Sequence, residues 1–244
     1  MEKKFELTDE TYYDDYADAR VYRIRALRDF GDVRGGDLGG FVEEESNLSH
    51  ESTCWIYDNA VVCKGSKVSE EAEVRDTAVV SDNSHVSENS RIYENARVYN
   101  SSIRGGVVHG NATVNNAEVL WQAEVKDEAN IRGGQIREGA TISENAIVSG
   151  DSYIWGYYTV VGRNAYVEDG EVYSTNDCRV FGGYGDLYVT WLREDNGFVL
   201  FGEKYDAKGL IESAHSFGGF AFANAISAIA GVEAIKLQTK QIRQ

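Results

Sequence analysis

Aliphatic residues recur at every sixth position through the first part of the chain. The series consists of Ile56, Val62, Val68, Val74, Val80, Val86, Ile92 and Val98. A small residue follows four positions after each of the first seven members, namely Ala60, Ser66, Ala72, Ala78, Ser84, Ser90 and Ala96. The positions between them are mostly polar or glycine. A period this regular is an internal repeat, and it predicts short strands separated by tight corners.

The repeat continues beyond Tyr99 when insertions or deletions of one residue are allowed. The aliphatic series runs through Ile103, Val108, Val114, Val119, Val125, Ile131, Ile136, Ile142, Val148, Ile154 and Val160, and less clearly through Val167, Val172 and Val180. Small partners persist at Ala112, Ala117, Ala123, Ala129, Ala140, Ala146 and Ser152. Because side chains alternate along a strand, the aliphatic residue points inward and its two neighbours point outward. Three such strands can close one triangular turn, and successive turns stack about 4.8 Å apart.

The predicted architecture is therefore mainly β, a parallel β-helix shaped as a triangular prism. At about 18 residues per turn, residues 54–182 form roughly seven turns and a rod on the order of 35 Å long. An ordinary antiparallel sheet would show longer and more variable spacing. We expect an N-terminal β cap over residues 1–53 and a small C-terminal α+β element, a hairpin plus helices, over residues 183–244.

The two ends of the chain support this division. The glycine-dense stretch GDVRGGDLGGFV lacks the G-x-G-x-x-G spacing of a dinucleotide loop and no helical pattern follows it, which favours a tightly folded cap over the first repeat. In the tail, LYVTWLRED and GFVLFGEKYD are joined through an Asn-Gly turn signal and predict a hairpin. Helical patterns follow, and polar residues interrupt the apolar run GFAFANAISAIAGVEAIKLQTKQIR, so we expect no membrane span.

An aliphatic residue followed four positions later by a small one resembles the motif of the hexapeptide-repeat left-handed parallel β-helix family. The resemblance covers about residues 54–182 and implies left-handed coiling. In addition, YRIRALRDFGDVRGGDLGGFV followed by NLSHESTCWIYDNAVV resembles the front end of uncharacterised hexapeptide-repeat proteins of bacteria, phages and prophages. This second resemblance implies no established activity.

The family resemblance also implies a type of reaction. Many members are trimeric acyltransferases that act from coenzyme A or acyl-carrier thioesters, hold their substrates in grooves between adjacent β-helices, and use a His as general base. The chain departs from these enzymes because it has no long insertion between hexads and no Pro. A homotrimer is the oligomer that the resemblance implies.

Composition limits the classes of partner that the protein is expected to bind. The chain has 40 Asp and Glu against 24 Lys and Arg, a net charge of −16, which disfavours direct nucleic-acid binding and attraction to an anionic membrane. Three Cys and a charged start without a visible signal peptide favour a reducing compartment, the cytoplasm, or the host cytoplasm for a phage-encoded protein. No Cys/His spacing resembles a metal site, and we expect no cofactor.

One group of outward positions carries candidate chemistry. A basic and aromatic column consists of Arg75, Tyr93, His109 and Lys126, each just after an inward aliphatic residue and about three hexads apart, with Arg91 beside Tyr93. Stacked on one face of an acidic protein, this column is suited to bind an anionic small molecule such as a nucleotide. The alternative is a face of mixed charge that serves solubility, because Glu73 and Glu124 share it.

Two further sets of outward residues raise hypotheses. The four histidines are His50, His85, His109 and His215. An outward His on a β-helix face can act as a general base, although a plain surface role is the alternative for each. Outward Val61, Val79 and Ile147, beside Cys63, Tyr99 and Thr113, predict a subunit interface because apolar side chains are unfavourable on a solvated face.

Three functions are compatible with these observations. The leading hypothesis is a non-catalytic, homotrimeric binding protein of phage or prophage type that sequesters a small anionic ligand, such as a nucleotide signal, on the column. The second is an acyltransferase with His109 as general base. The third is an acidic rod that imitates nucleic acid, against which the Arg and Lys side chains of the column count.

Overall fold

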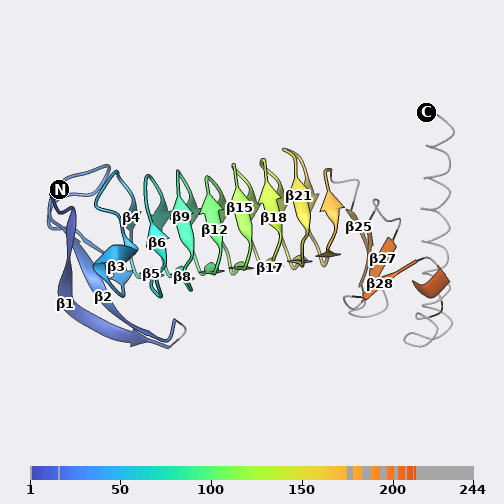
Figure 1. The fold of residues 1–244 in the computed structure, drawn as a ribbon, viewed down its shortest axis with the longest axis horizontal. Helices are drawn as coiled ribbons and strands as arrows, with labels where there is room; N and C mark the ends of the chain where they lie inside the picture. The colour runs from blue at the N-terminus through green and yellow to red at the C-terminus, as the bar shows by residue number, and fades with distance from the viewer. Residues whose placement is uncertain are drawn as a thin grey trace.

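Short strands stack into an elongated, three-sided coil in the computed structural model (Figure 1). The structure describes residues 2–15, 17–174, 178–182, 188–192, 197–200, 203–206, 208–210 and 212. Within these residues the coil is built from parallel strands, and each coil contributes one strand to each of three sheets. This confirms the predicted mainly β fold with stacked parallel coils.

The first side of the prism, sheet 1, joins ten strands in the order β1-β2-β3-β5-β8-β11-β14-β17-β20-β23. Its parallel members are β3 (Leu38–Val42), β5 (Val61–Val62), β8 (Val79–Ser81), β11 (Arg97–Tyr99), β14 (Thr113–Asn115), β17 (Asn130–Arg132), β20 (Ile147–Ser149) and β23 (Tyr166–Glu168). Strand β3 already pairs with β5 in parallel, so the stack begins inside the segment that we assigned to the cap.

The other two sides have seven described strands each. Sheet 2 consists of β4 (Trp55–Ile56), β7 (Glu73–Val74), β10 (Arg91–Ile92), β13 (Val107–Val108), β16 (Glu124–Val125), β19 (Thr141–Ile142) and β22 (Val160–Val161). Sheet 3 consists of β6 (Lys67–Val68), β9 (His85–Ser87), β12 (Ser102–Arg104), β15 (Glu118–Leu120), β18 (Gln135–Arg137), β21 (Tyr153–Trp155) and β24 (Glu171–Val172). Along the chain, each coil passes from sheet 2 to sheet 1 and then to sheet 3.

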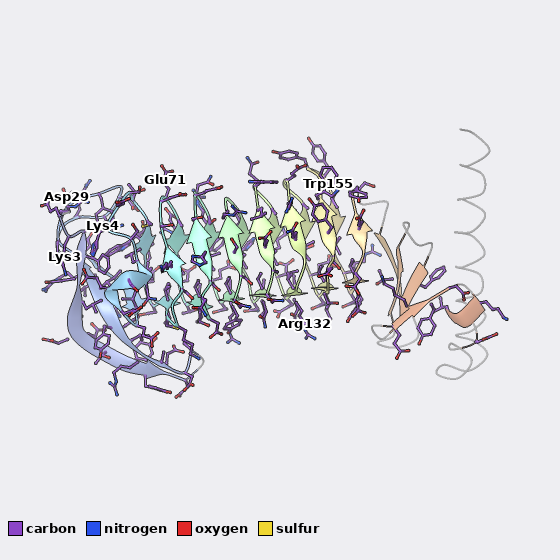
Figure 2. The ribbon with its side chains drawn as sticks, in the orientation of Figure 1. Lys3, Lys4, Asp29, Glu71, Arg132 and Trp155 are labelled. Atoms are coloured by element: carbon purple, nitrogen blue, oxygen red, sulfur yellow. The ribbon has the colours of Figure 1, made fainter. Side chains whose placement is uncertain are left out.

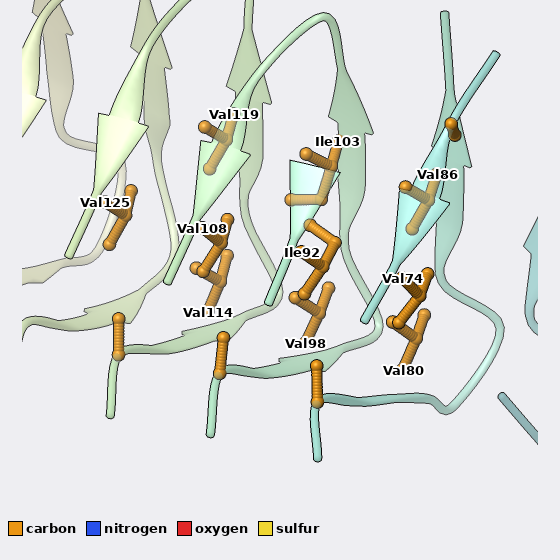
Figure 3. Packing of buried hydrophobic residues seen from close by; sticks show 14 of the residues in the cluster. Val74, Val80, Val86, Ile92, Val98, Ile103, Val108, Val114, Val119 and Val125 are labelled. Carbon is orange, nitrogen blue, oxygen red and sulfur yellow. The ribbon is translucent and has the colours of Figure 1, made fainter. Parts of the chain in front are cut away.

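The core is a set of aliphatic columns inside the prism. Val98 pairs in register with Val80 below and Val114 above, and all three side chains are fully buried. Figure 3 shows the same stacking for the inward residues of all three sheets. Each buried Val or Ile stabilises the fold by roughly 1.5–3 kcal/mol, so these columns are the main stabilising element.

The corners explain the polar positions of the repeat. The small residue of each hexad is buried where the chain turns into the next strand, as Ala78 and Ala96 show. Two residues before it, the backbone is left-handed, for example at Asp76 (φ 58°) and Glu94 (φ 59°). Short polar and acidic residues accept this conformation at an exposed corner better than β-branched ones do.

At the far end of the repeat the predicted register is wrong by one residue. Val161 is buried inside the prism, and Val160 is 43% exposed. The chain takes seven residues rather than six to go from Ile154 to Val161, and the additional length carries the exposed Tyr157 and Tyr158. An insertion of one residue reverses which side of the strand each side chain faces.

The repeat also ends earlier than predicted. Strand β25 (Cys178–Gly182), which contains Val180, pairs with β26 (Tyr188–Leu192) in antiparallel fashion instead of joining the parallel stack. Strand β27 (Gly197–Leu200) then pairs with β26, as the hairpin prediction requires, and β28 (Glu203–Tyr205) follows. The backbone N–H of Tyr166 donates to Oγ1 of Thr190 at 2.8 Å and links this small sheet to the coil.

The predicted C-terminal helices fall mostly on residues outside the described part of the chain. Within the described part, no helix is long and apolar enough to cross a membrane.

At the N-terminus, β1 (Phe5–Asp14) and β2 (Ala19–Ala26) form an antiparallel hairpin that extends sheet 1, and a short 3-10 helix, η1 (Glu45–Asn47), follows β3. Gly39 and Gly40 lie in β3, where a Cβ atom would come within 2.6 Å of the Ile56 carbonyl oxygen and 2.5 Å of the Ala60 carbonyl oxygen, respectively. The glycine-dense stretch therefore allows the first coil to close tightly.

The end of the core is sealed by a buried lysine. Lys4 is fully buried, and its ammonium group donates to the carbonyl oxygen of Cys54 at 2.8 Å and lies 5.0 Å from the centre of the Phe30 ring. Burial lowers the pKa of Lys4. Phe5 and Phe30 pack edge-on against Trp55 beside Lys4. The cap therefore covers the first coil with aromatic rings, and Lys4 satisfies the carbonyl group of Cys54.

The N-terminal hairpin corrects the predicted subunit interface. Val61, Val79 and Cys63 do point out of the prism, but they are 2%, 7% and 0% exposed because Ala17, Ala19, Val21 and Phe41 pack on them in a second apolar cluster. Figure 1 shows the hairpin lying along this side of the coil. The chain covers this part of the face with its own residues, so the part is not free for a second subunit.

Candidate functional site

The outer face of sheet 2 brings the predicted column together. Because Ile92 pairs in register with Val74 and with Val108, the residues that follow them, Arg75, Tyr93 and His109, lie above one another. Lys126 follows Val125 in the next coil and continues the column, and Arg91 occupies the neighbouring row. The parallel ladder thus assembles a site from four successive coils.

A shallow, open groove of about 630 Å3 runs along this face. It is lined by Glu73, Arg75, Arg91, Tyr93, Val107 and Glu124. The lining combines two guanidinium groups, two carboxylates and one phenol ring around an aliphatic side chain.

His109 has the most defined environment in the column. Its Nε2 atom lies 2.9 Å from Oε1 of Glu124, and its ring stacks on Tyr93 with centroids 4.6 Å apart at an angle of 10°. Its Nδ1 atom is 3.7 Å from Oε2 of Glu94, beyond hydrogen-bond distance. The Glu94 carboxylate instead accepts a hydrogen bond from the backbone N–H of Gly110 at 2.7 Å.

This arrangement selects the tautomer of the neutral imidazole. A carboxylate can only accept, so the hydrogen bond with Glu124 assigns the proton to Nε2 and leaves the lone pair on Nδ1. The His109 side chain is 18% exposed. The result is an oriented imidazole with a basic nitrogen, which is what a general base needs.

Glu124 is held by two donors. Lys126 Nζ donates to Oε2 at 2.9 Å, while His109 bonds to the other oxygen. Partial burial by itself raises the pKa of Glu124, but the hydrogen bonds from Lys126 and His109 outweigh it and hold that pKa below its ordinary value. The hydrogen bond to Glu124 also raises the pKa of Lys126. Glu124 therefore stays ionised while it orients the imidazole.

The pairing of Glu124 predicts a pH-dependent contribution to stability. A carboxyl group whose pKa is lower in the folded state stabilises the fold above its ordinary pKa of about 4.3, and this contribution is lost as the pH falls through the folded value. We expect Glu124→Gln to lower the free energy of unfolding at pH 7 by about 1 kcal/mol or less, because the pair is partly exposed. The difference from the parent should shrink below pH 4.

Thermal unfolding measured between pH 3 and pH 8 checks this prediction. The matched control is Glu138→Gln, at a corner of a neighbouring coil. A Glu124→Gln deficit that stays constant across this pH range would contradict the assigned pairing.

The other half of the column is also paired. The Arg75 guanidinium lies 3.7 Å from the centre of the Tyr57 ring, and its Nε donates to Glu73 at 2.9 Å. Burial of Arg75 lowers its pKa, but the hydrogen bond to Glu73 outweighs this effect and raises it. Arg91 is less engaged, since its Nε is 3.8 Å from the Glu73 carboxylate and its side chain is 66% exposed.

The face is thus an alternation of charges and not a basic stripe. This bears on two hypotheses. The paired carboxylates reduce the attraction of the face for anions, and the interleaved Arg and Lys side chains prevent a continuous acidic face that would imitate nucleic acid. The ligand-binding role assigned to the column stays a prediction.

The remaining histidines lie elsewhere. His50 is part of the cap, where its Nδ1 accepts the backbone N–H of Lys4 at 3.1 Å, its Nε2 lies 2.7 Å from Glu45, and its ring stacks on Phe5. His85 is exposed on sheet 3, on a different side of the prism from His109. His215 lies outside the described residues.

Sequence reasoning placed Glu124 on the face but missed its bond to His109, and it missed Glu94 altogether. Glu94 is a corner residue one coil before His109. Because acidic residues occupy most corners, its residue type alone did not indicate that it lies near the site. The spacing of 15 residues between His109 and Glu124, one coil apart, was the available signal for that pair. Among the described residues, no group of three His, Cys, Asp or Glu side chains is placed to hold a metal ion.

Comparison with known proteins gives one partial match. A protein of Escherichia coli strain K12 named as the uncharacterized acetyltransferase YdcK is 36% identical over 74 residues, which is 28% of this chain and 23% of that protein. The match therefore spans less than a quarter of the length of this relative. No protein-family profile matches the chain. Together with the stacked coils, the match is consistent with a repeat-built β-helix protein.

Proposed function

We propose that the protein catalyses acyl transfer from a thioester to an amine or hydroxyl group, with His109 as general base. The observation that carries this proposal is the imidazole held between Tyr93 and Glu124 with its Nδ1 lone pair unengaged. The name of the Escherichia coli relative, an uncharacterized acetyltransferase, supports the same reaction class, as does the resemblance of the hexads to an acyltransferase family.

The reaction assigns one role to each group. His109 Nδ1 takes the proton from the acceptor as its nitrogen or oxygen attacks the thioester carbonyl, and the resulting imidazolium is stabilised by Glu124 and by nearby Glu94. The tetrahedral intermediate then collapses with cleavage of the C–S bond. The imidazolium returns its proton to the departing thiolate, so the products are the acylated acceptor and a free thiol.

The groove supplies room for substrates beside the two residues that contact His109, although His109 itself is not among the lining residues. Tyr93 and Glu124 contribute to both the groove and the environment of the imidazole. Arg91, with its exposed guanidinium, is the side chain in the groove best placed to pair with a phosphate group on an acyl donor such as acetyl-coenzyme A.

The proposal is tested with the full chain and acetyl-coenzyme A. Release of free thiol is followed by a colorimetric thiol reagent in the presence of a panel of amines, amino sugars and alcohols, and the acylated product is identified by mass spectrometry. Acceptor-dependent thiol release supports acyl transfer. If no acceptor raises thiol release above the rate without protein, the proposal is wrong.

We also propose that the active form is a homotrimer in which a neighbouring copy covers part of the sheet 2 groove. The groove of one chain is open, and an acyl-transfer site gains from the exclusion of water that a second wall provides. The N-terminal hairpin already covers part of sheet 1, and of the two other sheets we select sheet 2 because it carries the groove. Native mass spectrometry should show a species of three chains, and a monomer at micromolar concentration would contradict this prediction.

Non-catalytic binding of an anionic small molecule, such as a phage protein sequestering a nucleotide signal, is a second candidate. Arg91 favours it, because its guanidinium is 66% exposed in the groove. The distinguishing observation is a nucleotide that co-purifies with the protein and is lost in Arg91→Ala, with no thiol release from acetyl-coenzyme A.

A further inference from the structure

The corner between sheet 1 and sheet 3 is shortened in three successive coils. In the coils on either side of these three, from Val80 to Val86 and from Val148 to Ile154, the inward residues are six positions apart. The three successive five-residue intervals are those from Val98 to Ile103, from Val114 to Val119 and from Ile131 to Ile136, and a separate one follows from Val167 to Val172. The corners from sheet 2 to sheet 1 keep six residues in these coils, and of the corners from sheet 3 to sheet 2 that follow, the one from Ile103 to Val108 is shortened to five, so the unbroken run of deletions lies on the edge between sheet 1 and sheet 3.

Shortened corners recess the edge, and full corners bound the recess at both ends. A groove of about 500 Å3 occupies this position, and it extends from Asn83 and His85 in one full corner to Asp151 and Tyr153 in the other. Five coils contribute to it, which at the spacing of stacked strands gives a length of roughly 19 Å. The groove is elongated along the rod and lies on the edge between sheet 1 and sheet 3, whereas the His109 site lies on the face of sheet 2.

The walls carry hydrogen-bonding groups in rows. On the sheet 1 side, Asn100 Nδ2 donates to Asn116 Oδ1 at 3.1 Å. On the sheet 3 side, Gln135 Nε2 donates to Glu118 Oε2 at 2.8 Å. Each of these amide and carboxylate groups has further donor or acceptor positions, so successive coils offer repeated pairs of donors and acceptors along the groove.

The charge of the lining disfavours an anionic ligand. Glu118 and Asp151 are carboxylates, His85 is the one basic side chain among the lining residues, and no Lys or Arg lines the groove. In a protein of net charge −16, a phosphate chain or a nucleic acid would be repelled from this surface. The groups that line the groove are therefore suited to bind a neutral ligand rich in hydroxyl groups.

An aromatic surface adjoins one end of the groove. Arg137 Nη1 donates to the Tyr153 hydroxyl at 2.7 Å and holds this ring at the groove wall. Trp155 lies edge-on to Tyr153, with ring centroids 6.4 Å apart, and is 37% exposed. Figure 2 shows Trp155 on the outer side of the coil near the last turns. Exposed rings beside polar side chains match the apolar C–H face and the hydroxyl rim of a sugar ring.

We propose that this groove binds a linear, neutral oligosaccharide along the axis of the rod. Sugar hydroxyls pair with Asn100, Asn116, Glu118 and Gln135, and one sugar ring packs on Tyr153. The length and openness of the groove suit a chain of sugar units and not a single sugar. The site is independent of the acyl-transfer proposal, since it lies away from the face of sheet 2 and uses none of the same residues.

The test is a glycan array probed with the full-length protein, followed by calorimetric titration with the neutral hexasaccharides maltohexaose, cellohexaose and chitohexaose. Binding should be weakened about tenfold by Tyr153→Ala, as expected for the loss of one stacked ring, and by a similar factor in Gln135→Ala. Matched controls are Tyr158→Ala and Asn130→Ala, which remove the same groups outside the groove and should change the affinity less than twofold. Thermal unfolding of each variant verifies that it is folded.

A second variant tests the shape of the groove. Inserting one glycine between Asn116 and Ala117 restores the six-residue corner in the middle coil and fills the recess. It should abolish oligosaccharide binding and leave the rate of acyl transfer unchanged. The proposal is overturned if no neutral oligosaccharide on the array binds, or if Tyr153→Ala and Gln135→Ala bind as tightly as the parent. Burial of the groove by a second copy of the chain, seen as protection of Tyr153 on oligomerisation, would also overturn it.

Discussion

His109→Ala should reduce the rate of acetyl transfer by about 10²–10⁴-fold, which is the usual contribution of a positioned general base. The reason is geometric. His109 is the side chain on this face that combines an unengaged basic nitrogen with an orienting carboxylate, Glu124, at 2.9 Å. Alanine removes both the base and the group that protonates the leaving thiolate. The measurement is kcat for thiol release from acetyl-coenzyme A with the best acceptor of the panel.

Two variants separate this role from a general loss of structure. His85→Ala removes an exposed histidine from sheet 3 and should leave the rate unchanged. Glu124→Gln keeps the shape of the side chain but weakens its hold on the imidazole, so we expect a rate loss of about 10–100-fold, smaller than that of His109→Ala. If His109→Ala retains the rate of acetyl transfer of the parent protein, His109 is not the general base.

Ile103→Ala should lower the free energy of unfolding by about 2–5 kcal/mol, the cost of truncating a fully buried aliphatic side chain without collapse of the cavity. Ile103 is 0% exposed at the centre of the rod, paired in register with Val86 and Val119. The backbone ladder holds these neighbours about 4.8 Å apart and prevents them from closing the cavity. For a chain of this size the midpoint of thermal unfolding should fall by about 5–15 °C.

The matched control for Ile103→Ala is Arg104→Ala, one position later in the same strand. Arg104 faces outward and is exposed, so its truncation should change stability by less than about 0.5 kcal/mol. Equal effects of the two substitutions, measured by circular dichroism, would contradict the alternation of inward and outward residues that defines the coil. Because each coil contacts only its neighbours, a defect in the middle of the stack also interrupts the coupling between its two halves.

Much of the fold follows from local pattern. The six-residue period and the small residue of each hexad correctly predicted which side chains enter the prism, because alternation in a strand is a local rule. The same rule placed Arg75, Tyr93, His109 and Lys126 in one column before any contact was known. It failed where one residue is inserted, at Val160, because a slip of one position exchanges the two sides of a strand.

The partnerships across the surface did not follow from that pattern. Whether the cations of the column are free or paired depends on side-chain conformations between coils, and the structure pairs Arg75 with Glu73 and Lys126 with Glu124. The apolar face around Val61 and Val79 was predicted to contact a second subunit, but a segment some forty residues before Val61, the hairpin with Val21, covers it. Such contacts lie far apart in sequence and carry no periodic signal.

The sequence by itself determined that this protein is a stack of parallel coils with an aliphatic interior, because strand alternation and the repeat length are properties of neighbouring residues. Only the tertiary structure decided that His109 is oriented by Glu124, that the hairpin covers part of sheet 1, and that three successive shortened corners align along one edge beside a groove. Each of these features depends on how successive coils align in register. That alignment is set by contacts between coils and not by the residues of any single hexad.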